Sequence, residues 1–373
     1  MTPLEMFPSL AVGAAANAGG RDADLAPVME ILPALERSAW AEDDGRTGAG
    51  ASVALLREAR ILQTLAEATP AHIARVLALV ATVNLSAARL LEGHVNAVRL
   101  VELYGTARQF SRVRSGIAAG TLLGVWGADS ERPVQCPAED GTLVGAKSRA
   151  SGLGDVSHAL ISVGSGESIR LALVDVGDAS RQDPSTWKML GMRATRSGDY
   201  DFDGARVAEW IGPPGVYFKE PHFIGGVWRI AAIQAGATIG LLQAAAADLE
   251  RRGRFEAEAQ IARLTTASLD TLAAWELVLR AARMVRGNGQ PEPSEAIVAL
   301  SAGTRLQTER CAQSAIAAVE QSIGLVHFDA RSDTGRIARD LAIYLRQAAR
   351  DALLQRAGRE LLNGTRPLSG WLR

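Results

Sequence analysis

Few groups of residues in this sequence have the spacing of a recognisable reactive site. The strongest candidate is the glycine-rich stretch Gly164-Ser-Gly-Glu-Ser-Ile169, a partial match to a dinucleotide-binding loop. Such a loop must open a helix whose N-terminus faces a phosphate. Here the stretch lies between two short apolar runs, Ala159–Val163 and Leu171–Val176, that are typical of strands. We therefore interpret it as the turn of a β-hairpin.

The histidines and acidic residues do not indicate a metal site or a pair of catalytic carboxylates. The five histidines are scattered singly, without the spacing of metal ligands. They are His72, His94, His158, His222 and His327. The acidic run Glu42-Asp43-Asp44 is typical of a solvated surface, and the sequence has no G-x-S-x-G motif of a serine hydrolase. Residue types alone predict a ligand-binding protein of mixed α and β structure.

The length and charge of the chain limit its architecture and its partners. Its 373 residues exceed the roughly 250–300 that one hydrophobic core usually supports, so we expect two or three packed units. The 40 basic and 41 acidic side chains leave a formal net charge of -1. This balance argues against nucleic acid or an anionic membrane as the main partner. We expect a small-molecule substrate or another protein instead.

Cysteine content and apolar segments favour a cytoplasmic protein. Cys136 and Cys311 are too few and too far apart for a disulfide framework. The N-terminal stretch lacks a basic segment followed by a sustained apolar run, so we predict no signal peptide. The most apolar later segment, Ile230–Leu249, contains two glutamines and an aspartate and suits a buried helix. No membrane-spanning segment is predicted.

Composition divides the chain into three predicted domains. Residues 1–119 are rich in helix-forming residues, and His72–Leu90 has apolar residues three and four positions apart, which predicts an N-terminal helical domain. Glycine, proline and short apolar runs become frequent from Gly120, which indicates a central β domain over residues 120–215, closing with a strand at Tyr200–Val207. Residues 216–373 are predicted as a C-terminal helical bundle. Its four long helices are expected at 225–254, 256–286, 294–323 and 335–363.

Four motifs follow one another from the end of the predicted β domain to the last helix. They are Trp187–Val207, which contains Gly-Met-Arg and then F-D-G-A-R-V, Arg252-Gly-Arg-Phe255, Gln321-Ser-Ile-Gly324 and Arg339-Asp340. In order and spacing they resemble motifs of the acyl-CoA dehydrogenase superfamily. The resemblance implies an α+β fold with an N-terminal helical domain, a central β-barrel-like domain and a C-terminal four-helix bundle. It also implies FAD held between the subunits of a homodimer or homotetramer.

The resemblance implies that the two middle motifs bind the nucleotide half of FAD. Arg252 and Phe255 fall in the R-x-x-F motif, whose arginine contacts the FAD pyrophosphate of a neighbouring subunit in the family. A guanidinium group suits two phosphate oxygens. Gln321 and Gly324 fall in the motif that lies along the adenosine of the flavin, where glycine permits a close backbone approach. From the residues alone, Arg252 could equally lie on a solvated basic surface, and Gln321 and Gly324 could simply end a helix.

Two further residues are implied to face the flavin ring. The segment Lys147–Gly152 resembles the strand whose hydroxyl and backbone face the edge of the ring, and Ser151 falls at the hydroxyl position. Arg149 stands where the family usually has tryptophan. Trp126 falls on the other strand expected to line the ring, and a tryptophan there could also belong to the core.

The usual catalytic bases of the family are missing. Alignment on Arg339-Asp340 places the commonest catalytic glutamate at Ala348, and some members instead carry it on the first bundle helix, where Trp228 stands. Neither alanine nor tryptophan can remove a proton. Asp351 is the nearest acidic residue in the sequence and a weak candidate for the base.

These residues leave three hypotheses about function. The first is an FAD-dependent oxidoreductase that acts on an acyl thioester such as acyl-CoA with a non-standard base. The second is a flavin-dependent monooxygenase of the same fold, in which no α-proton need be removed. The third is a non-catalytic subunit that binds a flavin or an acyl group.

Overall fold

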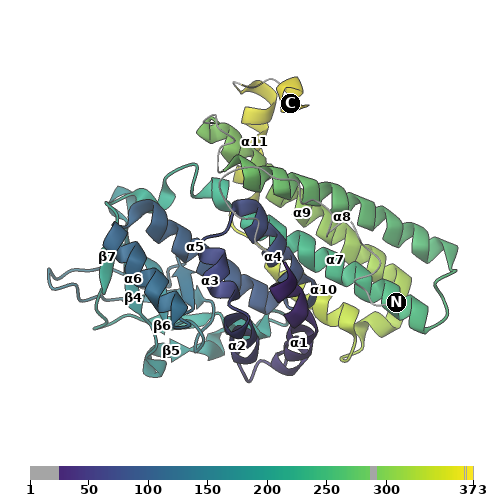
Figure 1. Cartoon of the computed structure of the whole chain (residues 1–373), viewed down its shortest axis with the longest axis horizontal. Helices are drawn as coiled ribbons and strands as arrows, with labels where there is room; N and C mark the ends of the chain where they lie inside the picture. The colour runs from purple at the N-terminus through teal and green to yellow at the C-terminus, as the bar shows by residue number, and fades with distance from the viewer. Residues whose placement is uncertain (1–24, 286–291, 365, 367, 373) are drawn as a thin grey trace.

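The structure, a computed structural model, describes residues 25–285, 292–364, 366 and 368–372. It combines helices with two small β-sheets; the strands lie in the middle of the sequence, between two sets of helices (Figure 1). The N-terminal stretch for which we predict no signal peptide lies outside the described residues, so the structure does not test that prediction.

The first set of helices covers one side of the strands and of the later helices. It comprises α1 (Ala26–Glu42), α2 (Gly50–Glu58), α3 (Ile61–Ala66), α4 (Pro70–Val83), α5 (Leu85–Tyr104) and α6 (Ala107–Ala118). The single helix predicted over His72–Leu90 is in fact the end of α4 and the start of α5. Asn84 has an extended backbone and accepts a hydrogen bond from the N–H of Ala87 at 2.9 Å, which caps α5. Because the apolar pattern continues across Asn84, the pattern did not reveal the break.

In the described part of the chain, seven strands form two sheets. They are β1 (Leu123–Trp126), β2 (Ala146–Ala150), β3 (His158–Val163), β4 (Arg170–Asp175), β5 (Gln182–Asp183), β6 (Gly198–Asp201) and β7 (Glu209–Ile211). The first sheet has the order β1-β3-β4-β7 and the second the order β2-β6-β5. The glycine-rich stretch at Gly164 joins β3 to β4 as an antiparallel hairpin, so that prediction is confirmed. The predicted strand at Tyr200–Val207 is wrong in extent, because Gly204, with a φ of 76°, turns the chain after β6.

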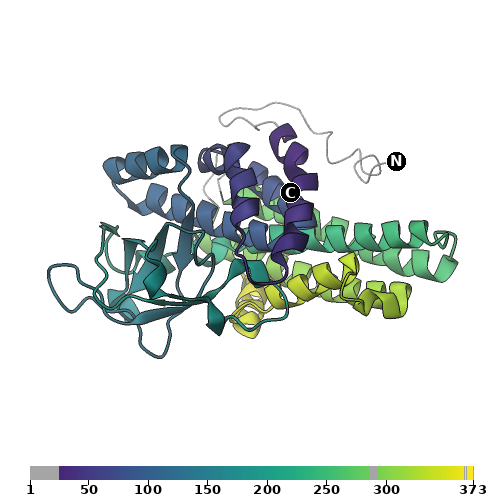
Figure 2. The same cartoon turned by 90° about the horizontal axis from the view of Figure 1, so that it is seen from below.

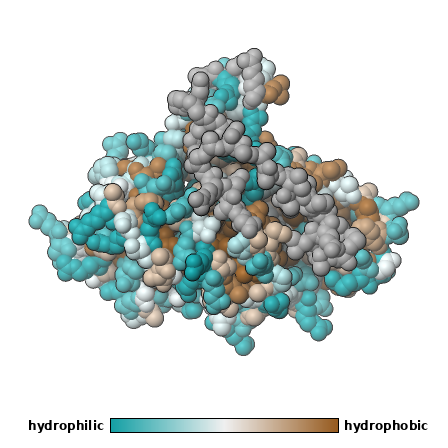
Figure 3. Space-filling model, viewed as in Figure 1, coloured by the Kyte–Doolittle hydropathy of each residue, from teal (hydrophilic) through white to brown (hydrophobic). Residues whose placement is uncertain are grey.

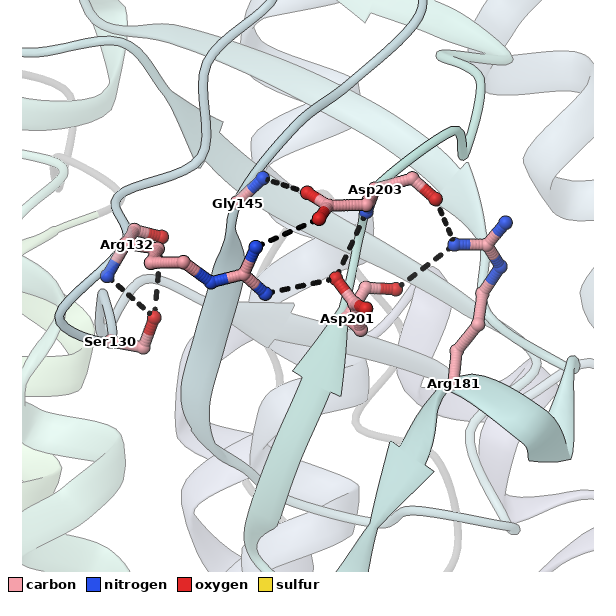
Figure 4. Close-up of polar contacts among 6 residues, drawn as sticks. All are labelled: Ser130, Arg132, Gly145, Arg181, Asp201 and Asp203. Atoms are coloured by element: carbon pink, nitrogen blue, oxygen red, sulfur yellow. Dashed lines mark hydrogen bonds and ion pairs between the residues drawn. The ribbon is translucent and has the colours of Figure 1, made fainter.

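A network of charged groups attaches the long connection between β1 and β2 to β6 (Figure 4). The guanidinium of Arg132 donates to the carboxylates of Asp203, at 2.8 Å, and Asp201, at 3.3 Å. Asp203 also accepts the backbone N–H of Gly145 at 2.6 Å. The hydrogen bonds from Gly145 and Arg132 lower the pKa of Asp203. Since each charge has a partner inside the network, we interpret it as a structural clamp on the surface.

The second set of helices forms an elongated bundle. It comprises α7 (Trp228–Arg251), α8 (Glu258–Met284), α9 (Ser294–Ile323), α10 (Asp333–Tyr344) and α11 (Arg350–Asn363). The fourth predicted helix, 335–363, is two helices, because the backbone of Ala349 adopts a left-handed conformation with a φ of 58°. No glycine or proline marks this break in the sequence.

Helix α7 packs directly on the backbone of α4. Gly236 and Gly240 of α7 lie against the backbone of Ala78 and Thr82, where a side-chain carbon on either glycine would overlap it. The two glycines therefore allow a close contact between the first set of helices and the bundle. The segment from Ile224 to Arg251 is the one helical segment among the described residues with the length and apolar composition of a membrane span. The helix packing buries 67% of its most apolar window.

Candidate functional site

Trp126 and Ser151, the residues implied to face a flavin ring, lie next to each other in the strand region. The indole N–H of Trp126 donates to the backbone oxygen of Ser151 at 3.0 Å, and the indole ring packs on Tyr200 with centroids 5.4 Å apart. The hydroxyl of Ser151 accepts a hydrogen bond from Ser197 at 2.9 Å, so its own hydrogen remains available. Arg149 is exposed, with a φ of 52°, beside an irregularity in the pairing of β2, and does not pack with Trp126.

The other four implied cofactor residues lie at the far end of the helical bundle. Arg252 follows α7 and pairs with Asp248 at 2.8 Å, and Phe255 is exposed in the next turn. Gln321 is exposed near the end of α9. Gly324, which follows α9, has a φ of 72° and open space around it. In the chain, α8 follows α7 and runs in the opposite direction, and α9 then runs parallel to α7. The motif after α7 and the motif at the end of α9 therefore lie at the same end of the bundle, as both views show (Figures 1 and 2).

These two groups of residues lie far apart in one chain. Arg229, at the start of α7, pairs with α5, and α5 packs on β1 next to Trp126. Arg252 lies just beyond the other end of this helix. A helix of 24 residues is about 36 Å long at 1.5 Å per residue. One chain therefore does not bring the six residues together.

The two positions of the usual catalytic base contain no titratable group. The backbone N–H of Trp228 donates to Ser301 at 2.9 Å, and its buried indole N–H has no hydrogen-bond partner among the described residues. Ala348 is exposed between α10 and α11. Asp351, the weak candidate, has a side chain that is 86% exposed and pairs with Arg350. Asp351 is thus a surface carboxylate on α11.

A buried ion cluster lies beside Trp228. Both carboxylate oxygens of Glu92, on α5, are paired: Oε2 with Arg89 at 2.9 Å and Oε1 with Arg229 at 3.2 Å. Arg229 also donates to the side-chain oxygen of Asn96 at 2.7 Å. Because both of its oxygens are engaged by guanidinium groups, Glu92 presents no free oxygen to a substrate. We name Arg89, Glu92, Asn96 and Arg229 the buried ion cluster.

Two tyrosines lie close enough to the buried ion cluster to feel its charges. Burial raises the pKa of Tyr217, and the charge of Glu92 raises it further. The same two causes raise the pKa of Tyr344, whose buried hydroxyl has no hydrogen-bond partner among the described residues. The hydroxyl of Tyr217 lies against Gly127, directly after β1. Both phenols stay protonated near neutral pH and can donate hydrogen bonds to a substrate oxygen.

Sequence reasoning missed the buried ion cluster. The signal that could have revealed it is the placement of Arg89, Glu92 and Asn96 at spacings of three and four, which puts all three on one face of a helix. The flanking apolar residues put that face in the core. The pairing with Arg229, 137 residues away, could not be inferred from the sequence.

The six residues implied to bind the cofactor are of types that suit a flavin, but they form two separate groups. The strand region offers an indole and a free hydroxyl donor, which suit an aromatic ring with polar edges. The bundle end offers a guanidinium, an exposed aromatic ring, an amide and an open glycine, which suit a nucleotide. Among the described residues no group of three or more histidine, cysteine or acidic side chains could hold a metal ion.

Neither a protein-family model nor a curated protein sequence matches the chain. Solved structures do match it over nearly their whole length, and they show that this chain has the acyl-CoA dehydrogenase fold. The expected fold is therefore supported. The sequence identities are too low to show more than the fold.

Three of these structures are monooxygenases or hydroxylases. Dibenzothiophene monooxygenase TdsC from Paenibacillus sp. A11-2 has a TM-score of 0.79 and 19% identity, covering 92% of this chain and 98% of that one. The 3-HSA hydroxylase from Rhodococcus sp. RHA1 has a TM-score of 0.75 and 18% identity, covering 91% and 97%. Methanesulfinate monooxygenase MsuC from Pseudomonas fluorescens has a TM-score of 0.73 and 18% identity, covering 92% and 98%. TdsC has also been solved with FMN bound.

Proposed function

We propose that this protein is a flavin-dependent monooxygenase that acts on a small molecule. The observation that carries the proposal is the structural likeness to TdsC and other oxygenases. The absence of a base at Trp228 and Ala348 supports it, because oxygenation does not require removal of an α-proton. The reading as an acyl thioester oxidoreductase has less support, because it needs a base that neither position supplies.

In this proposal the flavin ring lies by Trp126 and Ser151, and a bound reduced flavin supplies the activation of oxygen. Tyr217, Tyr344 and Arg229 then orient the substrate by donating hydrogen bonds. The buried position of these donors strengthens each bond, because little water competes for it. Glu92 has a positioning role: it holds Arg229 by an ion pair.

We propose that the site is completed by a second copy of the chain, in a homodimer or homotetramer. The support is the distance along α7 between the two groups of cofactor residues. A second support is exposed apolar surface at the bundle end, where Leu325 is 86% and Phe328 65% exposed, beside Gly324. The face shown in Figure 3 likewise has apolar groups between polar ones. A cytoplasmic location remains part of the proposal.

The choice between FAD and FMN depends on the bundle end. Arg252, Phe255, Gln321 and Gly324 are assigned to the nucleotide half of FAD, which FMN lacks. If FAD is the cofactor, these residues contribute to binding, whereas FMN would leave them without a ligand. We propose FAD on the basis of these motifs, and the FMN-bound form of TdsC makes FMN the alternative.

The test begins with the absorption spectrum of the purified protein and its reconstitution with FAD and FMN. The flavin-loaded protein is then supplied with a flavin reductase, NADH and ¹⁸O₂, with catalase present to remove free peroxide. Indole and dibenzothiophene, taken from the names of the TdsC structures, are the first substrates to try, followed by aromatic and sulfur-containing panels. Mass spectrometry should detect one ¹⁸O atom in a product.

An anaerobic experiment separates the main alternatives. Oxidised, flavin-loaded protein is mixed with short- to long-chain saturated acyl-CoA while the flavin absorbance is followed. A positioned base contributes about 10²–10⁴-fold in rate, so we expect very slow bleaching. Fast bleaching without ¹⁸O incorporation would establish the dehydrogenase reading instead. A protein that binds neither FAD nor FMN would be a non-catalytic subunit.

A further inference from the structure

A cationic cavity lies at the junction of the α1–α2 connection and the loop before β6. Its volume is about 360 Å³, within the range of small-molecule sites. It is lined by Gly45, Pro184, Trp187, Lys188, Met189, Leu190, Arg193 and Arg196. Three of these residues are basic and none is acidic. We call it the cationic cavity.

The three basic side chains have no carboxylate partner among the described residues. Lys188 makes no ion pair or side-chain hydrogen bond, and Arg193 donates to the backbone oxygen of Asp44. Arg196 lies along Gly48 beside Asp155, whose pKa burial raises and the charge of Arg196 lowers, but it forms no ion pair within 4.0 Å among the described residues. Arg132, in the surface clamp, shows the contrasting case: its guanidinium group forms ion pairs with two aspartates. Unpaired positive charges that converge on a concave surface attract an anion.

A rigid backbone holds these side chains in place. Met192 and Arg196 adopt left-handed conformations, with φ values of 55° and 41°, which are unfavourable for residues other than glycine and are held by the surrounding contacts. Asp340 of α10 accepts the N–H of Met192 at 2.6 Å. Gly191 lies directly against the backbone of Arg339, where a side chain would not fit. A loop held in this way is preorganised, so little entropy is lost when a ligand binds.

The remaining lining is apolar and aromatic. The indole N–H of Trp187 donates to the backbone oxygen of Met192 at 3.0 Å, so the ring offers apolar surface to the cavity. Met189 and Leu190 are exposed beside it. An apolar wall next to three cations matches a ligand that combines a ring with several negative charges.

We propose that the cationic cavity binds a phosphorylated small molecule with an aromatic ring, of the nucleotide class. Lys188, Arg193 and Arg196 contact the phosphates, and Trp187 contacts the ring. Two sources share this chemistry: a free nucleotide, and the adenylate half of a flavin dinucleotide, which would then lie in this cavity and not at the bundle end.

The lysine content of the chain permits a direct test. The sequence has three lysines: Lys147, Lys188 and Lys219. Lys147 is fully buried and Lys219 is exposed outside the cavity, so they are internal controls for Lys188. The full-length protein is treated with a limiting amount of an amine-reactive label, with and without inorganic pyrophosphate or ADP. Mass spectrometry then gives the labelling rate of each lysine.

We expect pyrophosphate and ADP to slow the labelling of Lys188 and to leave that of Lys219 unchanged. Calorimetry should show ADP binding weakened about tenfold or more in Arg196→Ala and in Lys188→Ala. The matched control Arg206→Ala removes an exposed arginine that pairs with Asp140 outside the cavity, and should bind ADP normally. The proposal is overturned if sodium chloride at the same ionic strength protects Lys188 equally, or if both variants bind ADP like the wild type.

Competition distinguishes the two sources. If FAD displaces ADP from the cavity while FMN does not, the cavity takes the adenylate half of FAD. If ADP binds equally well to the flavin-free and flavin-loaded protein, the cavity is a separate nucleotide site. The ADP measurement needs no flavin and no turnover, so it is independent of the monooxygenase proposal.

Discussion

The buried ion cluster and the cationic cavity use the same kind of side chain in opposite ways. In the cluster, Arg89 and Arg229 share one carboxylate, that of Glu92; Arg229 is nearly buried and Arg89 partly so. In the cavity, Arg193 and Arg196 form no ion pair among the described residues. The comparison indicates that the role of an arginine depends more on whether it is paired with a carboxylate than on how many arginines lie near it. A paired arginine is fixed in place with its charge compensated, whereas an unpaired one keeps its charge for an anionic ligand.

The largest expected effect is on the buried ion cluster. Glu92→Gln should lower the free energy of unfolding by up to about 3–5 kcal/mol, because it leaves the buried guanidinium of Arg229 and the partly exposed one of Arg89 without a counter-charge. Urea denaturation measures this change. The matched control is Glu102→Gln on the same helix, whose exposed pair with Arg99 should contribute less than about 1 kcal/mol. If the two substitutions lowered the free energy of unfolding equally, burial would not make the pairs of Glu92 more stabilising than the exposed pair of Glu102.

The next effect concerns the carboxylate that anchors the loop of the cationic cavity. Burial raises the pKa of Asp340 to about 6, from an ordinary value near 3.8. Because the folded protein then binds the proton more tightly than the unfolded chain, Asp340 stabilises the fold below pH 4, and this contribution is lost as the pH rises through 6. A shift of this size corresponds to up to about 3 kcal/mol.

Asp340→Asn tests that linkage, since asparagine can still accept the N–H of Met192. Unfolding by urea at pH 4 to 8 should show the variant matching the wild type at low pH and exceeding it in stability at pH 7. Asp351→Asn, at an exposed carboxylate, should leave the pH profile unchanged. Parallel profiles for wild type and Asp340→Asn would show that Asp340 does not titrate in this range.

Arg252 lies between the two extremes of the comparison, because it is paired with Asp248 yet exposed to solvent. If it contacts the pyrophosphate of FAD, Arg252→Ala should weaken FAD binding by roughly 1.5–3 kcal/mol and leave FMN binding unchanged. Fluorescence titration with each flavin measures both. Arg254→Ala is the neighbouring control. Unchanged FAD affinity would assign Arg252 to a solvated surface.

The smallest effect is expected at the surface clamp. Arg132→Ala removes ion pairs to Asp201 and Asp203 on the surface, where water and salt screen the charges. Thermal unfolding should therefore change little. A loss comparable to that of Glu92→Gln would contradict the view that burial makes the difference.

The sequence predicted the order of structural elements better than their ends. Helices, strands and the hairpin at Gly164 followed from composition and apolar spacing, because these reflect which face of each element is buried. The breaks at Asn84 and Ala349 were missed, since neither interrupts the apolar pattern. The site was harder to predict: motifs indicated Arg252 and Ser151, but the pairing of Glu92 with Arg229 depends on how α5 meets α7. The cationic cavity was likewise not predictable, because it is lined by Gly45 and by residues up to Arg196, which are far apart in the sequence and come together only in the fold.

The contact of α7 with α4 at Gly236 and Gly240 has a consequence for motion. Two helices whose backbones touch cannot slide past each other by part of a turn, because any shift brings side chains into the space that the glycines leave free. The first set of helices and the bundle must therefore move as one body. In the proposed function, a substrate would then reach Tyr217 and Arg229 past a surface segment and not between the two sets of helices. The stretch between β7 and α7 is the natural candidate, since it includes Tyr217 and the exposed rings of Phe218 and Phe223.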